Sequence, residues 1–468
     1  MIQTARISAE DKAPVEHGLF LIMSMISWRF FRTIVICIFL CAVCSSCASV
    51  PAVQRRLRRL AAAGDFDRAV EVLARLPEGS YGKNNQLLEA LDRGMILHYA
   101  GWYRESIAAF ETAKRVYDEL YTRSLSKIAA SWLWNDAALP YPGEDFERAM
   151  INAFQALNFA AIQDYNEALV EARNVQSVLQ RINDRYQAGQ KNVYQDDAFV
   201  RMLTGILYES TGQRLDLNDA FVSYKKAVAG YEGHFQDDYS LNAPDVLLEN
   251  CLSLAGWMGR RDLDFYQRQF LDKTYVSLAE RASRAEIYII YYHGQIVNKV
   301  QGTIVLPGMD GLLTRISFPK YRKAFQPERE IHVRAVSPEG QEKEIILQKA
   351  QDLDAIARQN LENRRLRILA KAVARPLTKQ ILAGAAEDVV RDKKGQTVGD
   401  LTYYAANVYL LYSEEADLRA WETLPSVISI GRLILEPGAY DFFAGKEKIA
   451  SLAVSEGDKK FIMHWAAY

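Results

Sequence analysis

Apolar residues recur every three or four positions from Val53 to about Phe270, and this spacing predicts amphipathic helices joined by short turns. In the clearest copies, a glycine at the turn is followed two residues later by an aromatic residue, as in Gly101 and Tyr103. The glycine can end the first helix in a left-handed conformation, and small residues on the second helix let its neighbour approach closely. Copies of the pattern centre on Gly64, Gly101, Gln163 and Gly212, the third without its glycine.

The spacing resembles that of tetratricopeptide repeats, helix–turn–helix units of about 34 residues that stack because no single pair can bury its apolar face. An irregular helical bundle with coincidental glycine–aromatic pairs is the alternative interpretation. Stacked helix pairs generate a concave groove that holds a peptide or a protein partner. We therefore expect a tetratricopeptide-like helical array with such a groove at residues 48–275.

The periodicity changes near Glu286, where short alternating or β-branched runs begin, bounded by glycine, proline and asparagine. EIYIIYYHG, TRISFPKY and EIHVRAVSPEG are such runs, and SVISIGRLILEPGAY resumes the pattern later in the chain. Short strands at this spacing predict a β-sandwich-like domain. The predicted fold is multidomain α+β, with a signal segment at 1–47, the helical array at 48–275, the β-sandwich-like domain at 284–350 and 424–468, and a helical insertion at 351–423.

Apolar residues at helical spacing between Asp352 and Arg419 predict the insertion, which Pro376 should kink or break. One part of it carries a basic band. This band is either a solvated helix face or a contact with anionic lipid headgroups or an acidic partner. The candidate residues of this basic face are Arg364, Arg365, Arg367 and Lys371.

An aromatic and charged segment, SWLWNDAALPYPGEDFERAM, joins the second and third helical copies. Pro142-Gly143 predicts a turn, and the acidic residues after it favour the start of a helix electrostatically. The structural interpretation is this turn and helix start, and the functional one is a loop at the groove mouth that contacts the partner. The candidate contact residues are Trp132, Trp134, Tyr141, Glu144, Asp145 and Arg148.

The stretch that ends at Cys47 has the layout of a bacterial lipoprotein export signal. Arg29 and Arg32 precede the apolar run Thr33–Val43, and small residues lead to Cys47. Acyl chains on Cys47 would bury many methylene groups, so membrane attachment through this lipid would be effectively permanent.

An uncleaved anchor helix over residues 18–50 is the alternative interpretation of this segment. The two arginines interrupt it, so no continuous apolar run of about 18 residues exists. Acidic residues near the start make a poor basic leader, and translation starting at Met23 or Met25, rather than at Met1, would remove them.

Composition narrows the classes of function. The 57 basic and 58 acidic residues give a net charge of -1, so no basic surplus favours nucleic acid. After Cys47 the only further cysteine is Cys251, which cannot form an internal disulfide and is expected to be a buried apolar residue. The histidines are isolated, and the sequence has no recognisable motif for a metal, a nucleotide or a serine nucleophile. We therefore expect no catalytic activity, cofactor or small-molecule substrate, with structural roles for His293 and His332.

The cysteine at the processing site, the stretch YPGEDFERAMINAFQALNFAAIQDYNEALVEARNVQSVLQRI, the strand pair and ADLRAWETLPSVISIGRLILEPGAY together resemble a family of uncharacterised tetratricopeptide-type lipoproteins of Gram-negative bacteria. The resemblance implies an outer-membrane anchor facing the periplasm, which Ala48 after Cys47 suits, and it implies no established activity.

We therefore expect a lipid-anchored periplasmic scaffold that binds a protein partner in its helical groove during cell-envelope assembly. Activation of a peptidoglycan synthase is a narrower version, by analogy alone. From a different class, a peptidoglycan-cleaving enzyme is the alternative, which would need an acidic residue in a sugar-binding cleft.

Overall fold

The structure is a computed structural model that describes residues 52–127, 139–184, 194–307, 313–322, 330–365, 368–370, 372–374, 392 and 415–466. The predicted signal segment 1–47, with Cys47, lies outside the described residues. Within the described ranges, no helix is both long enough and apolar enough to span a bilayer.

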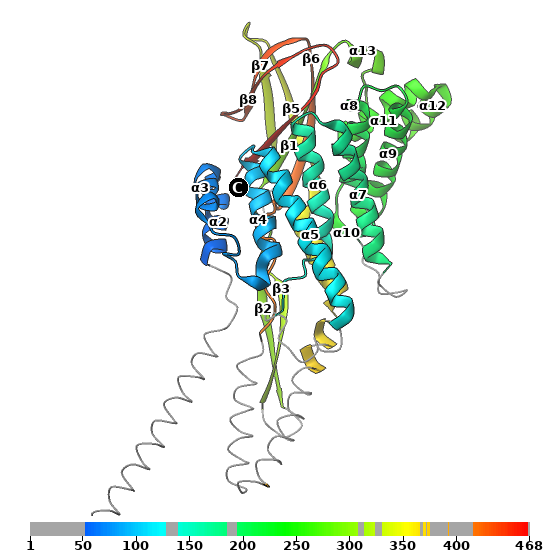
Figure 1. Cartoon of the computed structure of the whole chain (residues 1–468). Helices are drawn as coiled ribbons and strands as arrows, with labels where there is room; N and C mark the ends of the chain where they lie inside the picture. Colours follow the sequence, from blue (N-terminus) through cyan, green and yellow to red (C-terminus); the bar gives the residue numbers. More distant parts are fainter. Residues whose placement is uncertain are drawn as a thin grey trace, which may run out of the picture. The chain divides into compact units, whose positions relative to one another are not determined.

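Helix pairs make up most of the first half of the described chain, as the apolar periodicity predicts (Figure 1). The helices of each pair are joined by a short connection and pack against each other, in the order α4–α5, α6–α7, α8–α9 and α11–α12. The helices are α2 (Ala52–Ala62), α3 (Phe66–Arg75), α4 (Gln86–Tyr99), α5 (Tyr103–Lys127), α6 (Asp145–Ala161), α7 (Tyr165–Asn183), α8 (Ala198–Ser210), α9 (Asp216–Gly230), α10 (Gln236–Tyr239), α11 (Asp245–Met258), α12 (Arg260–Gln269), α13 (Leu278–Ala282) and α14 (Leu353–Asn363).

The turns after α4, α6 and α8 use the left-handed conformation that the sequence pattern predicts. Gly101 and Gly212 have φ angles of +77° and +69°, and Gln163, in the copy without glycine, adopts +61°. Glycine also permits close approach of paired helices, because a Cβ atom at Gly94 would lie 2.5 Å from the Phe110 ring. These local features of the repeat are confirmed, whereas a tetratricopeptide-like array is not confirmed as the fold.

Among the described residues, the strands form one seven-stranded sheet and a separate two-stranded hairpin. The order in the large sheet is β8-β7-β4-β5-β6-β1-β9, and only the β1–β9 pair is parallel. This sheet is nearly closed. The strands are β1 (Ala285–His293), β2 (Lys299–Pro307), β3 (Leu313–Tyr321), β4 (Ile331–Val336), β5 (Glu342–Asp352), β6 (Val427–Leu435), β7 (Gly438–Ala444), β8 (Glu447–Val454) and β9 (Lys459–Ala466).

The predicted β-sandwich is not confirmed. Strands from the two predicted parts, 284–350 and 424–468, alternate within a single sheet instead of forming two facing layers. The order of strands in the sheet cannot be predicted from the pattern of each strand alone, because both neighbours of β1, the strands β6 and β9, lie far from it in the sequence. The coarser prediction of a mixed helix-and-strand chain is confirmed.

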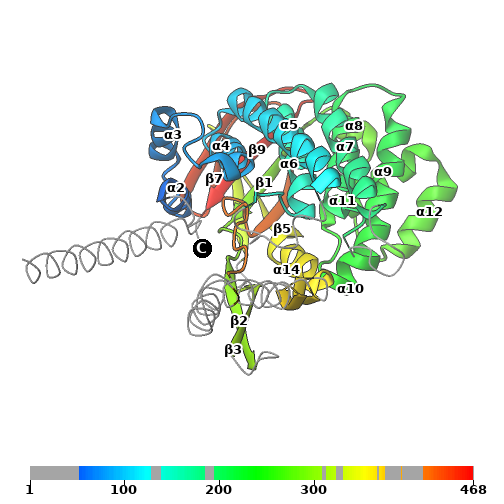
Figure 2. The ribbon, with the colours of Figure 1, turned by 60° about the horizontal axis from the view of Figure 1, so that its bottom comes forward.

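Strand β1 is buried on both faces and places the helices and the sheet around a shared core. Tyr288, Ile290 and Tyr292 belong to the apolar cluster that includes the paired helices, and Ile287 and Ile289 belong to a second cluster formed by the sheet itself. This alternation follows from the two-residue period of a strand. In Figure 2 the helical layer lies over the sheet, with α4 and α6 in contact with β9.

The inner face of the helical layer, where the sequence analysis places a groove, packs against the protein's own chain. Besides the strands, the segment 415–424 crosses it and buries Trp421 completely. The Trp421 ring meets those of Phe110 and Phe154 edge-on, at centroid distances of 5.8 and 6.1 Å. Of the predicted insertion 351–423, α14 is described, and most of the rest lies outside the described residues.

Candidate functional site

The start of α6 is built by the predicted Pro-Gly turn. Gly143 has a φ of +75°, and a Cβ atom there would meet the Tyr117 ring at 2.9 Å, so both the conformation and the packing favour glycine. The next residue, Glu144, donates its backbone N–H to the Glu147 carboxylate at 3.0 Å. This reciprocal arrangement satisfies an amide at the helix start and fixes both carboxylates in the interior.

Glu144 lies between two cations that come from distant parts of the chain. Lys299, at the beginning of β2, and Arg364, at the end of α14, each pair with one of its carboxylate oxygens. The Lys299 Nζ also donates to the carbonyl of Arg419 at 3.0 Å. Burial lowers the pKa of Lys299, and the nearby Glu147 opposes that shift. The pairing therefore ties α6, β2 and α14 together through buried charges.

Glu147 accepts two further donors. The Tyr141 hydroxyl donates to Oε2 at 2.7 Å, and the backbone N–H of Trp421 donates to Oε1 at 2.8 Å. Burial raises the pKa of Glu147, with Lys299 and these donors acting against the rise. Glu147 thereby positions the segment that carries Trp421 over the helical layer.

Arg419 completes this arrangement. It forms a two-pronged ion pair with Asp417, with contacts of 2.8 and 2.7 Å, and donates to the carbonyl of Leu139 at 2.9 Å. Its guanidinium also lies 5.4 Å from the centre of the Tyr141 ring. We call this group the α6 cluster, and it comprises Tyr141, Glu144, Glu147, Lys299, Arg364, Arg419 and Trp421.

The structure brings four of the six predicted contact residues together, but inside the protein. Tyr141, Glu144, Asp145 and Arg148 are all buried, with exposed fractions of 2–9%. Arg148 pairs with Asp118 at 2.8 Å and lies over the Tyr117 ring, at 4.3 Å from its centre. These contacts match the structural interpretation of the segment. Trp132 and Trp134 lie outside the described residues, and their role stays a prediction.

The predicted basic face divides in the same way. Arg364 turns inward to Glu144, whereas Arg365 pairs with Glu362 at 2.7 Å on the surface. Arg367 and Lys371 lie outside the described residues. The band is therefore not uniform, because its first arginine belongs to the α6 cluster.

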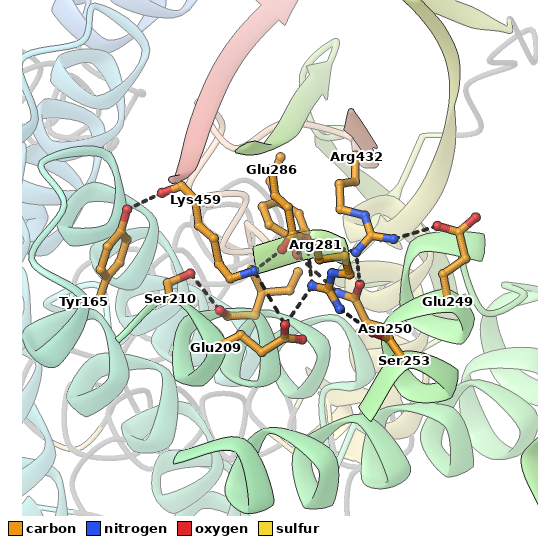
Figure 3. A network of polar contacts seen from close by, with 12 residues as sticks. Tyr165, Glu209, Ser210, Glu249, Asn250, Ser253, Arg281, Glu286, Arg432 and Lys459 are labelled. Carbon is orange, nitrogen blue, oxygen red and sulfur yellow. Dashed lines mark hydrogen bonds and ion pairs between the residues drawn. The ribbon is translucent and has the colours of Figure 1, made fainter. Parts of the chain in front are cut away.

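A second buried network joins the helices to the sheet, and Figure 3 shows it from close by. Its centre is Glu286 on β1, which pairs with Arg281 at 2.6 Å, with Arg432 of β6 at 3.0 Å and with Lys459 of β9. Arg281 also pairs with Glu209 of α8 at 2.7 Å. Burial alone would raise the pKa of Glu286, but the three cations hold it well below its usual range.

The same network reaches α11. Arg432 donates to Asn250 and pairs with Glu249 at 2.8 Å, and Arg281 donates to the Ser253 hydroxyl at 3.1 Å. Three acidic and three basic side chains thus balance each other between the helical layer and the sheet. We call this group the interlock network, and it comprises Glu209, Glu249, Asn250, Ser253, Arg281, Glu286, Arg432 and Lys459.

The interlock network was not predicted, although the sequence carries a signal for it. Glu286 begins the apolar run EIYIIYYHG, and Arg432 lies inside the apolar run SVISIGRLIL. A charged residue within a strand that is otherwise wholly apolar requires a buried partner of opposite charge. Pairing the two runs on that basis would have predicted the β1–β6 contact.

Two other buried groups have strongly shifted pKa values. Burial raises the pKa of Asp92 to about 7, although Thr423 and Tyr81 donate hydroxyls to it at 2.8 and 3.1 Å. Burial lowers the pKa of His98 to about 4, and this ring bonds Asn158 at 2.6 Å and the Tyr292 hydroxyl at 2.7 Å. Both groups lie where α4 meets other parts of the core.

The remaining predicted residues have structural contacts. His293 bonds the Ser429 hydroxyl at 3.0 Å across the β1–β6 pair, and His332 faces Glu344 at 3.1 Å on the exposed face of the β4–β5 pair. Cys251 is completely buried in α11, and burial raises the pKa of its thiol to about 12. In the part of the chain that the structure describes, no group of three or more metal-ligating side chains converges.

The contacts of the carboxylates in both clusters indicate what these clusters do. The central carboxylates, Glu147 and Glu286, are engaged by donors of the protein itself and lie behind packed helices. Groups held in this way fix the elements that carry them. Comparisons with protein-family models, with curated proteins and with solved structures find no match for this chain.

Proposed function

We propose that this chain is a lipid-anchored periplasmic scaffold that holds a protein partner during cell-envelope assembly. The anchor is the lipid on Cys47, in the outer membrane, and the described residues form the rigid body that it carries. Buried ion pairs support this view, since the α6 cluster and the interlock network bind helices, sheet and hairpin into one unit. A rigid body suits a protein that presents a surface, because little ordering entropy is lost on binding.

The surface that contacts the partner is best sought outside the helical groove, because that face already holds β1, β6, β9 and Trp421. The observation that carries the proposal is a group of large apolar side chains left exposed at the α11–α12 end of the helical layer. Trp257 and Phe265 are 39% and 56% exposed. Arg214, which precedes the 86% exposed Leu215, lies 5.9 Å from the Trp257 ring centre. Aromatic residues beside arginine are typical of the centres of protein interfaces.

Site-specific photocrosslinking in intact cells tests this contact. A photoreactive amino acid replaces Phe265 in the full chain, and Val170 of α7, which is 46% exposed, provides the matched control position. We expect one discrete adduct from position 265, lost when Trp257 is changed to aspartate, and none from position 170. Equal labelling at both positions, or none at either, contradicts the proposed contact.

Two further measurements separate the proposal from its alternatives. The mass of the N-terminal peptide reports whether Cys47 is lipidated, and an unmodified cysteine contradicts the anchor. Zymography on peptidoglycan tests the enzyme alternative, and a clearing zone that one acidic substitution abolishes would replace the scaffold with an enzyme. Identifying the adduct by mass spectrometry tests the narrower version, a peptidoglycan synthase.

A further inference from the structure

Helix α2 has a basic side that faces away from the protein. Its 11 residues include four arginines and no acidic residue. Arg55, Arg56 and Arg59 are exposed, whereas Arg58 is half-buried and pairs with Glu422 at 3.2 Å. At 3.6 residues per turn, the three exposed arginines lie within about 100° of one another around the helix axis. We call this surface the α2 arginine face, and it comprises Arg55, Arg56 and Arg59.

The opposite side of α2 is packed against the protein. Leu57 and Ala61 are completely buried, Gln54 is buried beside them, and Leu57 belongs to the apolar cluster of the paired helices. Gln295 donates to the carbonyl of Arg58 at 3.1 Å. In Figure 1, α2 lies beside α3 and α4 at one side of the helical layer. The α2 arginine face is therefore held in a fixed position, and little ordering entropy is lost when it binds.

Contacts within the protein do not account for the α2 arginine face. In the described chain, Arg56 and Arg59 form no ion pair, and Arg59 donates to the carbonyl of Arg55 at 3.3 Å. Arg55 and Arg59 are four residues apart, a spacing at which like charges repel on a helix surface. The first turn of α2 also lacks the acidic residue that the helix dipole favours there. These charges thus oppose the stability of the helix, and an external anion would offset their repulsion.

Arginine side chains suit phosphate groups, because the planar guanidinium can donate two parallel hydrogen bonds to a phosphate and stays charged. Anionic phospholipids present phosphates in a layer and attract basic segments close to the membrane surface. Cys47, the proposed lipid attachment, precedes Ala52, the first residue of α2, by only five residues in the sequence. Even when fully extended, that connection spans about 17 Å. The anionic surface within reach of α2 is therefore that of the membrane that holds the lipid.

We propose that the α2 arginine face binds the phosphate groups of anionic phospholipids in the membrane to which Cys47 is attached. The inference rests on the proposed lipid anchor and adds an electrostatic contact to it. The lipid alone limits the distance between the protein and the membrane, whereas the arginine contact also fixes which side of the helical layer faces the lipid headgroups.

Fluorescence quenching at the membrane surface tests this contact. The full-length lipoprotein is reconstituted into vesicles that contain a headgroup nitroxide lipid, with a fluorophore on Ala62→Cys or, as control, on Val170→Cys. Ala62 is exposed and lies on the same side of α2 as Arg55. Cys251 is completely buried, and the unsubstituted chain, treated identically, gives the background from the other cysteines. We expect several-fold stronger quenching at position 62 in vesicles of phosphatidylethanolamine and phosphatidylglycerol than in vesicles of phosphatidylcholine, and no such difference at position 170.

Charge reversal tests which arginines are responsible. Arg56→Glu/Arg59→Glu should reduce the quenching at position 62 in phosphatidylglycerol vesicles to the level seen with phosphatidylcholine. Arg68→Glu on α3 is the matched control, because the Arg68 side chain is 75% exposed, and it should leave the quenching unchanged. High salt should weaken the quenching of the wild type, since it screens exposed charges.

The outcomes separate this inference from the proposed anchor. A lipidated chain whose label at position 62 is quenched equally in both kinds of vesicle overturns the lipid contact, leaves the anchor intact and points to an acidic protein as the partner of the arginines. An equal loss of quenching in Arg68→Glu overturns the assignment to α2. An unmodified Cys47 overturns the anchor itself. Emission at position 62 that shifts to the blue without vesicles, as the protein concentration rises, means that a second copy covers this face and also overturns the lipid contact.

Discussion

Replacing Glu286 by glutamine should destabilise the protein far more than any surface substitution. Glutamine keeps the shape of the side chain but removes the negative charge that contacts Arg281, Arg432 and Lys459 together, and of these Arg281 and Lys459 also contact Glu209. The Glu286 side chain is 1% exposed, so water cannot take the place of the lost partner.

The magnitude follows from the burial of the partners. Arg281 and Arg432 keep Glu209 and Glu249, respectively, but each loses a charged contact of 3.0 Å or less. Breaking a buried ion pair while leaving its partner in place costs about 3–5 kcal/mol. That is a large part of the 5–15 kcal/mol by which a typical protein is stable.

Urea unfolding of the wild type and of Glu286→Gln, followed by circular dichroism, measures this loss. Glu436→Gln is the matched control, because Glu436 is 68% exposed and pairs with Arg284 at 2.9 Å. We expect about 1 kcal/mol or less for the control. If Glu286→Gln also costs less than about 1 kcal/mol, the interlock network does not hold the helices to the sheet.

The pH dependence gives an independent check. The pKa of Glu286 in the folded protein lies below its ordinary value of 4.5, so its contribution is complete above about pH 4.5 and is lost as the pH falls towards the folded value. The stability difference between wild type and Glu286→Gln should therefore shrink on acidification below that point. A difference that grows with acid contradicts the assigned direction of the shift.

Three more substitutions test the core. The stability of Asp92→Asn relative to the wild type should increase as the pH rises from about 4 to about 7, because burial raises the pKa of Asp92 to about 7 and the folded state of the wild type resists its ionisation. Urea unfolding at pH 5 and pH 8 measures the difference in unfolding free energy, and the same difference at both pH values refutes the prediction. Gly94→Ala should destabilise the protein by about 1–3 kcal/mol, because the added Cβ atom would lie 2.5 Å from the Phe110 ring. Gly256→Ala is the control and should not destabilise, since the nearest neighbour of its Cβ atom is the Tyr275 hydroxyl at 3.6 Å. Equal melting temperatures of the two variants would contradict the close approach at Gly94. Trp421→Ala should lower the free energy of unfolding by about 3–5 kcal/mol, because it leaves a cavity beside Phe110 and Phe154. If the variant melts at the same temperature as the wild type, the segment 415–424 does not stabilise the helical layer.

Much of the local structure could be predicted from the sequence, because its causes lie within a few residues. The glycines at 101 and 212 take the left-handed turns that their pattern indicates, and Pro142-Gly143 precedes a helix as expected. Gln163 shows that the rest of the repeat imposes the turn even where glycine is missing.

The arrangement of the elements could not be predicted in the same way, because its causes are distant in the chain. The local sequence around Tyr141 and Glu144 is compatible with either exposed or buried side chains. Their burial follows from contacts with Lys299, Arg364 and Arg419, which are distant in the chain. The open groove was expected because the helical half was considered alone. The strands that cover its inner face come from the other half, and their own pattern gives no hint of which helices they meet.

The pairing of β1 with β6 has a consequence for how the chain avoids aggregation before it is folded. Glu286 and Arg432 come from these neighbouring strands but are 146 residues apart in sequence. Eight consecutive residues of β1 are buried in the final structure, so an unpaired β1 is a hazard while the intervening chain is still being made. A charge at the head of β1 and another inside β6 penalise incorrect pairing, since each charge is neutralised only when the right neighbours arrive. The same ion pairs that hold the finished protein together thus also act as gatekeepers during its synthesis.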